Sequence, residues 1–318
     1  MIDAVVRAKR AAPRPTWIRV VMGVVMGLAS AACGADPTGT LYLFGDASPA
    51  SPPEAGASKP QPAPAPTLMP TAPAPDCPAA AMLIYVTGEG SALYSFDPTV
   101  GVFTKIGVLT CLDTPTHMTV DRTATAWVVS DGQLYRASTA NASCSRVAAW
   151  TPDPVNFDDF ALTFIGTTTA TDTSLYVLGT TGELASFDTT SGMVTSMGNV
   201  FLAKTHTNAS GGRGDMTTNG DGTLYYTDDS TPTQTLNEID PTDATVLSTY
   251  VTGEDDSADS GALAFYGGLF YDFVGTRVFT FDTATMKTSP LGTAPLEVTG
   301  AGQSTCVPTT APPPAVLH

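Results

Sequence analysis

Basic residues are scarce in this sequence, which has 14 Lys and Arg against 30 Asp and Glu and a formal net charge of −16 over 318 residues. Binding to the phosphate backbone of nucleic acid needs clustered Lys and Arg, so the composition argues against a nucleic-acid partner. No apolar run reaches the roughly 18 residues that a transmembrane helix needs. The 29 Gly and 26 Pro disfavour a helix bundle, and the many Thr, Val and Leu favour an all-β fold.

The first 33 residues have the parts of an export signal. Basic residues within 7–19 precede a short apolar run at 20–28, and small residues lead to Cys33. The segment Ser-Ala-Ala-Cys at 30–33 resembles a bacterial lipobox, although its first residue is Ser where that motif usually has Leu. The resemblance implies lipidation of Cys33, a membrane attachment through lipid alone, and delivery to the outer membrane of a bacterial cell envelope. An ordinary signal peptide cleaved near Ala32 is the alternative.

Residues 34–80 read as a Pro/Ala-rich tether. Eleven of the 26 prolines lie between Pro49 and Pro78, and the segment has almost no side chain to bury. Such a composition predicts a disordered, extended chain with polyproline II character. At about 3.1 Å per residue its reach is at most on the order of 100 Å, so the following domain would work away from the bilayer.

One phrase of about five residues recurs in the remainder of the chain. It occupies residues 93–97, 134–138, 184–188, 236–240 and 278–282, and its last positions are separated by 41, 50, 52 and 42 residues. An alternating apolar segment precedes most of these phrases, and turn pairs such as Asp131-Gly132 lie between the two. Periods of 40 to 50 residues are typical of four-stranded propeller blades.

The first of these units has no innermost strand. The other four have one, at 117–120, 160–165, 215–218 and 262–266, and a matching segment at 297–301 is left over at the C-terminus. We therefore predict a five-bladed β-propeller over residues 81–307, closed by its C-terminal strand, with a disordered tail at 308–318. Closure also removes an open sheet edge that would invite aggregation. A pair of open β-sandwich sheets is the alternative.

Four cysteines remain when Cys33 is set aside, and an exported chain meets oxidising conditions. Cys77 lies just before the first strand of the predicted ring and Cys306 lies just after the last, so closure predicts a Cys77–Cys306 disulfide. Cys111 and Cys144 then remain to form the second bond. A zinc site is the rival interpretation, but the sequence has no Cys-x-x-Cys.

The repeat resembles the YVTN and PQQ-type propellers of bacterial surface and periplasmic proteins. The residues that carry this resemblance are Tyr85-Val-Thr-Gly88 and the Leu-Tyr-x-Phe-Asp phrase at 93–97. The order of lipobox, Pro-Ala linker and propeller also resembles that of uncharacterised bacterial lipoproteins. Both resemblances imply a surface-anchored binding or scaffold protein whose partner is another protein or a glycan, with no evident catalytic machinery.

Acidic residues concentrate in the loops expected on one face of the propeller. The candidate ligand or metal residues there are Asp215, Asp255, Ser257, Asp259, Glu297 and His117. Converging oxygens suit Ca²⁺, although the two local patterns, at 255–259 and 219–222, lack the full spacing of an EF-hand calcium loop. The simpler interpretation is that these acids are solvated and keep an exported protein soluble.

A carbohydrate-active hydrolase is the enzymatic alternative. Asp215 and Glu297 are expected to begin inner strands and could supply a general acid and base, with Asp159 as the third carboxylate. His117, also at the start of an inner strand, could be a ligand or a proton shuttle. Few aromatic residues accompany these loops, which disfavours sugar stacking and leaves binding as the preferred function.

Overall fold

The computed structural model describes residues 77–151, 156–166, 174–202, 207–209, 214–228, 233–253, 261–310, 315 and 317. The chain divides into two units, Met1–Pro64 and Ala65–His318, and every described residue belongs to the second. This part is all-β apart from two short 3₁₀ segments, η1 (Ala79–Met82) and η2 (Glu89–Ser91). The predicted signal peptide, with Cys33, and nearly all of the predicted tether lie outside the described residues.

Three antiparallel sheets of four strands follow one another along the chain. The first consists of β4 (Pro115–Val120), β5 (Thr125–Ser130), β6 (Gln133–Ser138) and β7 (Cys144–Arg146). The second consists of β8 (Phe160–Phe164), β9 (Ser174–Gly179), β10 (Glu183–Asp188) and β11 (Val194–Asn199). The third consists of β14 (Met216–Thr218), β15 (Leu224–Asp228), β16 (Thr235–Ile239) and β17 (Val246–Val251). A two-stranded ribbon pairs β12 (Phe201–Leu202) with β13 (Thr207–Asn208).

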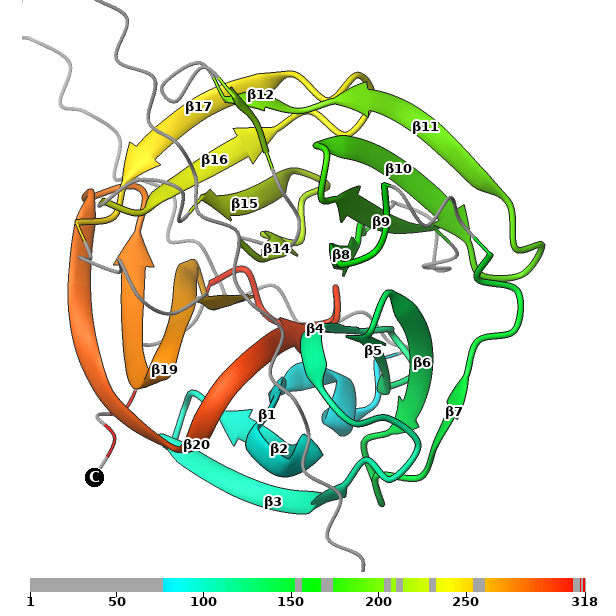
Figure 1. Ribbon diagram of the computed structural model, residues 1–318. Helices are drawn as coiled ribbons and strands as arrows, with labels where there is room; N and C mark the ends of the chain where they lie inside the picture. The colour runs from blue at the N-terminus through cyan, green and yellow to red at the C-terminus, as the bar shows by residue number, and fades with distance from the viewer. Residues whose placement is uncertain are drawn as a thin grey trace, which may run out of the picture. The chain divides into compact units, whose positions relative to one another are not determined.

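A fourth, six-stranded sheet joins the two ends of the described chain, in the order β18-β19-β20-β1-β2-β3. Its strands are β18 (Ala262–Tyr266), β19 (Leu269–Asp282), β20 (Lys287–Gln303), β1 (Ile84–Gly88), β2 (Ala92–Asp97) and β3 (Val102–Val108). The inner strands β4, β8, β14 and β18 contact one another in chain order, and β20 contacts both β4 and β18. The sheets therefore surround a common axis, and the domain is a β-propeller (Figure 1).

The C-terminal strand closes the ring as predicted, because β20 pairs antiparallel with β1 in the register Ile84↔Gln303 and Val86↔Ala301. The predicted number of five separate blades was wrong, since the described strands form four blade sheets. The physical reason lies in β20, which runs for 17 residues without a break. Its first half pairs mainly with β19 and its second half with β1, so hydrogen bonds continue from the last repeat into the first.

Turn chemistry explains where the strands reverse. Asp131 and Gly132 both have positive φ, 50° and 68°, as a type I′ hairpin between β5 and β6 requires. At the opposite ends of the strands, the Asp that ends the recurring phrase accepts a hydrogen bond from the backbone amide two residues on. This happens at Asp97, Asp188, Asp240 and Asp282. Hydrogen bonds to the loop hold the pKa of Asp188, Asp240 and Asp282 below the usual value.

Apolar side chains fill the space between neighbouring sheets. Between the first and second sheets, Trp150 is 1% exposed and lies with its ring centroid 4.6 Å from Phe160 and 5.1 Å from Phe187. Its indole Nε1 donates to the Gly132 carbonyl at 3.2 Å, so the one polar atom of the ring is satisfied. Equivalent clusters lie between the other pairs of sheets, which fixes each sheet against its neighbours.

Both predicted disulfides are present. Cys77–Cys306 joins the start of the described chain to the segment after β20, with a Cα–Cα distance of 5.8 Å. Cys111–Cys144 joins the β3–β4 connection to β7. The first bond fastens the closure made by β20, and the second ties neighbouring sheets together.

The two disulfides should differ in their contribution to stability. Cys77–Cys306 spans 229 residues and Cys111–Cys144 spans 33. On the chain-entropy account, the disulfide that closes the longer loop stabilises the folded protein by about 5.5 kcal/mol, and the one that closes the shorter loop by about 4 kcal/mol. We expect Cys77→Ser/Cys306→Ser to have a lower Tm than Cys111→Ser/Cys144→Ser when thermal unfolding is followed by circular dichroism. A Tm of Cys77→Ser/Cys306→Ser that equals or exceeds that of Cys111→Ser/Cys144→Ser would contradict the importance of ring closure.

Candidate functional site

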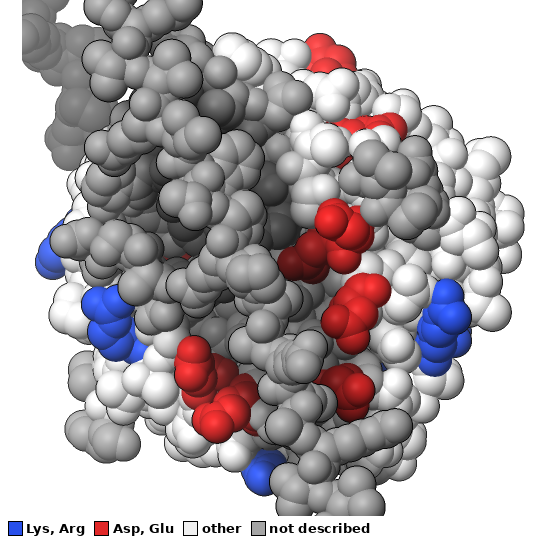
Figure 2. All heavy atoms as spheres, in the orientation of Figure 1, with Lys and Arg blue, Asp and Glu red and all other residues white. Residues whose placement is uncertain are grey.

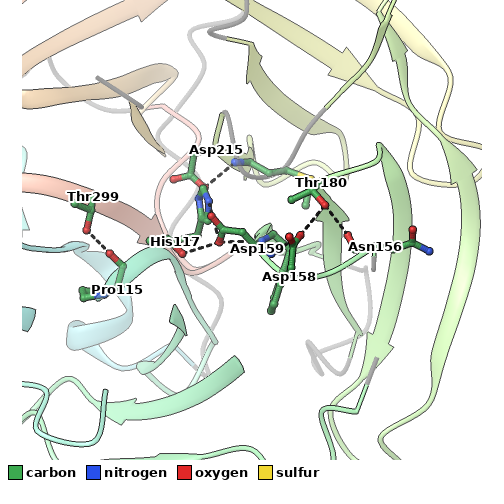
Figure 3. Close-up of polar contacts among 11 residues, drawn as sticks. Pro115, His117, Asn156, Asp158, Asp159, Thr180, Asp215 and Thr299 are labelled. Atoms are coloured by element: carbon green, nitrogen blue, oxygen red, sulfur yellow. Dashed lines mark hydrogen bonds and ion pairs between the residues drawn. The ribbon is translucent and has the colours of Figure 1, made fainter. Parts of the chain in front are cut away.

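Three polar side chains meet where the inner strands begin. His117 lies in β4, Asp159 directly precedes β8, and Asp215 directly precedes β14. These three strands are neighbours around the axis. The imidazole of His117 lies between the carboxylates of Asp215 and Asp159 (Figure 3).

The closing strand β20 approaches the backbone at His117 closely. A Cβ at Gly300 would lie 3.0 Å from the carbonyl carbon of His117, and one at Gly302 would lie 2.5 Å from the Met118 carbonyl oxygen. A side chain at Gly302 would therefore clash with the backbone of β4, and one at Gly300 would crowd it. Thr299 adds a hydrogen bond from its hydroxyl to the Pro115 carbonyl at 2.6 Å (Figure 3). The closure of the ring and the position of His117 thus depend on the same strand.

Asp215 is fully buried. Its Oδ1 accepts from the Met216 amide and its Oδ2 from the Leu263 amide, both at 2.9 Å. Oδ1 also lies 3.3 Å from Nδ1 of His117. A carboxylate oxygen only accepts, so the Nδ1–H of His117 donates to it. Asp215 is therefore sealed by protein donors and orients the imidazole without reaching solvent.

Asp159 is the carboxylate of the cluster that solvent reaches, because its side chain is 31% exposed. Its Oδ1 accepts from the Thr116 hydroxyl at 2.9 Å and from the Phe160 amide at 3.1 Å. The distance from this oxygen to Nε2 of His117 is 3.8 Å, which is an ion-pair distance and too long for a hydrogen bond. Asp159 thus offers negative charge to a ligand while it faces His117.

The environment of His117 raises the pKa of its imidazole. Burial favours the neutral form and acts to lower the pKa, but the hydrogen bond to Asp215 and the charges of Asp215 and Asp159 outweigh it. The two carboxylates therefore stabilise the charged form of a residue that is only 5% exposed. Charge of opposite sign on both sides makes this burial tolerable.

Asp158 extends the exposed acidic surface beside Asp159. Its Oδ1 accepts from the Thr180 hydroxyl at 2.8 Å and from the Asp159 amide at 3.1 Å. The backbone carbonyl of Asn156, in the same connection, accepts a hydrogen bond from the Thr180 amide at 2.9 Å. These bonds hold the 156–159 connection against the β9–β10 turn (Figure 3). We call the group formed by Thr116, His117, Asp158, Asp159 and Thr180 the axial mouth.

Other acids lie at the same end of the strands, on connections, at the start of β10 or within β20. They are Glu89, Asp113, Asp131, Glu183 and Glu297. Figure 2 shows Asp and Glu side chains gathered around the middle of one face, while the Lys and Arg side chains visible there lie toward its edge. The axial mouth therefore lies in a region of negative potential.

Gln303 forms a second polar cluster on the axis that the sequence did not reveal. It is the last residue of β20 and is 2% exposed. Its Oε1 accepts from the Phe265 amide at 3.0 Å, and its Nε2 donates to the Thr218 carbonyl at 3.0 Å. The closing strand is thereby bonded to β18 and β14 through one side chain. Side chains alternate between the two faces of a strand, so extending the predicted inner strand 297–301 by two residues would have placed Gln303 on the same face as Ala301, toward the axis.

The structure brings together three of the candidate residues named from the sequence, His117, Asp159 and Asp215. Glu297 is exposed and makes no hydrogen bond or ion pair within the described part of the chain. Asp255, Ser257 and Asp259 lie outside the described residues, so their role as calcium ligands stays a prediction. Among the residues that are described, no three His, Cys, Asp or Glu side chains are arranged to hold a metal ion.

The chain matches no protein-family model and no curated protein sequence. The resemblance to YVTN and PQQ-type repeats therefore stays a prediction. Nor does any helical segment of the described residues combine the length and the apolar character needed to cross a membrane.

Three solved structures are similar to this chain at low identity. A structural genomics protein of unknown function from Bacteroides thetaiotaomicron is 11% identical, with 69% of this chain and 63% of that chain covered and a TM-score of 0.44. The WD40 domain of Pan2 from Neurospora crassa is 15% identical, with coverages of 68% and 64% and a TM-score of 0.36. Glutaminyl cyclase from Myxococcus xanthus is 13% identical, with coverages of 60% and 70% and a TM-score of 0.36. The match spans less than two thirds of the first two chains.

The raised pKa of His117 predicts a pH-dependent stability. A basic group with a raised folded-state pKa stabilises the fold fully at pH values below its unfolded pKa, and this contribution is lost as the pH rises through the folded pKa. We expect the free energy of unfolding, measured with urea, to fall from pH 6 to pH 9 more steeply in the natural protein than in His117→Gln.

Asp159→Asn is the matched comparison, because the charge of Asp159 is the smallest of the causes that act on His117. The Asp159→Asn variant should retain most of the fall in the free energy of unfolding between pH 6 and pH 9. Parallel pH profiles for the natural protein and His117→Gln would show that the imidazole is not held in its charged form.

Proposed function

We propose that this protein is an exported, lipid-anchored binding propeller whose axial mouth receives a positively charged group of a partner protein or glycan. The observation that carries the proposal is the pair of adjacent carboxylates, Asp158 and Asp159. Asp158 is exposed and Asp159 is partly so, and within the described residues neither is paired with Lys or Arg. Acids that are held in place by hydrogen bonds and are not paired with Lys or Arg are prepared to meet a cation at little ordering cost.

The surrounding charge supports the same conclusion. Acids on the neighbouring connections add to the field at the mouth, and a field of one sign raises both the local concentration and the association rate of oppositely charged ligands. Positive charge on His117 would oppose a cation, but Asp215 offsets it from the buried side. The net charge presented to a ligand therefore remains negative.

Binding is a better-supported function than glycoside hydrolysis. A hydrolase needs two carboxylates that reach the substrate from the two sides of the scissile bond. Asp215 is fully buried and already accepts two backbone amides and the imidazole. It orients His117 and cannot itself contact a substrate. Glu297 makes no contact that would place it opposite Asp159.

The attachment to a membrane rests on the sequence. The lipobox-like segment ending at Cys33 and the Pro/Ala-rich residues 34–80 are consistent with a domain that is held at a surface by lipid and reaches away from it. An anchored domain needs no catalysis to be useful, since tethering raises its effective concentration toward partners at the same surface.

Loss of the two mouth carboxylates should weaken binding of a cationic probe. We expect Asp158→Asn/Asp159→Asn to bind a fluorescent hexalysine peptide at least ten-fold more weakly than the natural protein in fluorescence anisotropy at low salt. Asp221→Asn/Asp243→Asn is the matched control, because it removes two exposed charges from turns outside the mouth, where Asn keeps the oxygen that accepts from Thr223 and Thr245. Equal weakening in both variants would refute a site at the mouth.

Lipidation gives an independent test of the anchor. When the full chain is expressed with its leader in a bacterial host, we expect it to enter the detergent phase of a Triton X-114 separation, and Cys33→Ser to remain in the aqueous phase. Cys77→Ser/Cys306→Ser serves as the control, since it alters cysteines that are not part of the lipobox-like segment. Aqueous partitioning of the natural chain would contradict the lipid anchor and leave the binding proposal unaffected.

A further inference from the structure

A groove lies on the first sheet, at the ends of the strands opposite the axial mouth. It is formed by the turns at 123–125 and 138–140 together with Pro78, Arg136 and Ser145, and has a volume of about 460 Å³. This volume falls within the range of small-ligand sites. β4 starts at the mouth and ends before the first of these turns, so the groove is separate from the site proposed above.

The charge of this groove is opposite to that of the rest of the protein. Its described lining contains one Arg, five hydroxyl side chains and no Asp or Glu. In a chain with more than twice as many acids as bases, a groove without a carboxylate is a departure from the average surface. An anion therefore meets less repulsion here than at the acid-lined mouth.

Arg136 is held in place without using its hydrogen-bond donors. Its guanidinium lies 5.0 Å from the ring centroid of Trp127, a cation–π arrangement. Among the described residues it makes no hydrogen bond and no ion pair. All five N–H donors of a positioned guanidinium are thus available, and that planar fork matches the two oxygens of a carboxylate or a sulfate.

The support beneath Arg136 is rigid. The indole Nε1 of Trp127 donates to Oδ2 of Asp121 at 3.0 Å, and Oδ1 of the same carboxylate accepts from the amides of Thr123 and Thr125, each at 2.9 Å. Asp121 is buried under these neutral donors and makes no pair with Arg136. The ring on which Arg136 rests is therefore fixed before any ligand arrives, which lowers the cost of binding.

Hydroxyl groups complete the groove. The Ser138 oxygen accepts from the Ala140 amide, which leaves its proton to donate, and the Ser145 hydroxyl has no hydrogen bond within the described residues. Ser145 lies directly opposite Arg136 in the β6–β7 register. Hydroxyls both donate and accept, so they match a ligand that is itself rich in hydroxyls.

We infer that this groove binds a saccharide that carries an anionic group, carboxylate or sulfate, with Arg136 gripping the anion and Ser138 and Ser145 contacting the sugar hydroxyls. A carboxylate and a sulfate would both bind the guanidinium in this way, and the choice of disaccharide probe distinguishes them. The inference stands independently of the proposed function at the axial mouth.

The test measures dissociation constants by titration calorimetry for three disaccharides, one containing glucuronate, one sulfated and one neutral. We expect saturable binding of at least one anionic disaccharide and at least ten-fold weaker binding of the neutral one. Arg136→Gln should weaken the anionic complex at least ten-fold. Arg146→Gln, which removes the same charge from the neighbouring strand outside the groove, should change it less than two-fold.

A second variant keeps Arg136 in place. Ser145→Asp puts a carboxylate opposite the guanidinium, where it should pair with Arg136 and abolish binding, while Ser143→Asp adds the same charge in the turn beyond the groove lining and should not. Equal losses in the two Asp variants, equal losses in the two Gln variants, equally tight binding of the neutral disaccharide, or no saturable binding of either anionic disaccharide would each overturn the inference.

Discussion

The pairing of β20 with β1 is the constraint on which the rest of the structure depends. Without β20 beside it, β1 would be a free sheet edge, and exposed edges are sites of non-native pairing. Here the last strand supplies the innermost position beside the first, and three features hold it there. They are the β-ladder itself, the side chain of Gln303 and the Cys77–Cys306 bond. Loosening any of them acts on the axis as well as on the edge, because Gly300 and Gly302 of the same strand lie against the backbone at His117.

Burying charge near the axis limits what this site can do. A charged residue inside a protein is tolerated when opposite charge and hydrogen bonds replace water. His117 and Asp215 satisfy this condition because they bond to each other and Asp215 also accepts from two backbone amides. The same bonds that make the pair tolerable remove Asp215 from contact with a ligand. A ligand at this end of the propeller would therefore meet the partly solvated carboxylates of Asp158 and Asp159 rather than that of Asp215.

Much of this fold could be read from the sequence because its signals are local or periodic. The recurring phrase, the Asp turns, the leftover strand at 297–301 and both cysteine pairs all follow from spacing. The number of separate sheets could not be read, because it depends on whether hydrogen bonds continue along β20 from β19 to β1. The site was found only in part. Their acidity singled out Asp159 and Asp215 in the sequence. Burial leaves Asp159 partly exposed and Asp215 inaccessible to solvent, and this burial is set by the packing of distant strands. Arg136 carried no signal at all, since its lack of a partner is a property of three-dimensional position.

The large excess of acidic residues says less about function than their number suggests, because these residues play different physical roles. Asp97, Asp188, Asp240 and Asp282 are occupied by the amides of their own turns and would be needed in a propeller that binds nothing. Asp121 and Asp215 serve as buried acceptors that position Trp127 and His117. Acids that are at least partly exposed and not paired with Lys or Arg are the ones that can attract a ligand, and Asp158 and Asp159 meet that condition on structural elements held by several bonds. Arg136 meets the same condition with the opposite sign at the other ends of the strands. Two sites of opposite charge on one rigid ring would select different ligands, because each repels what the other attracts.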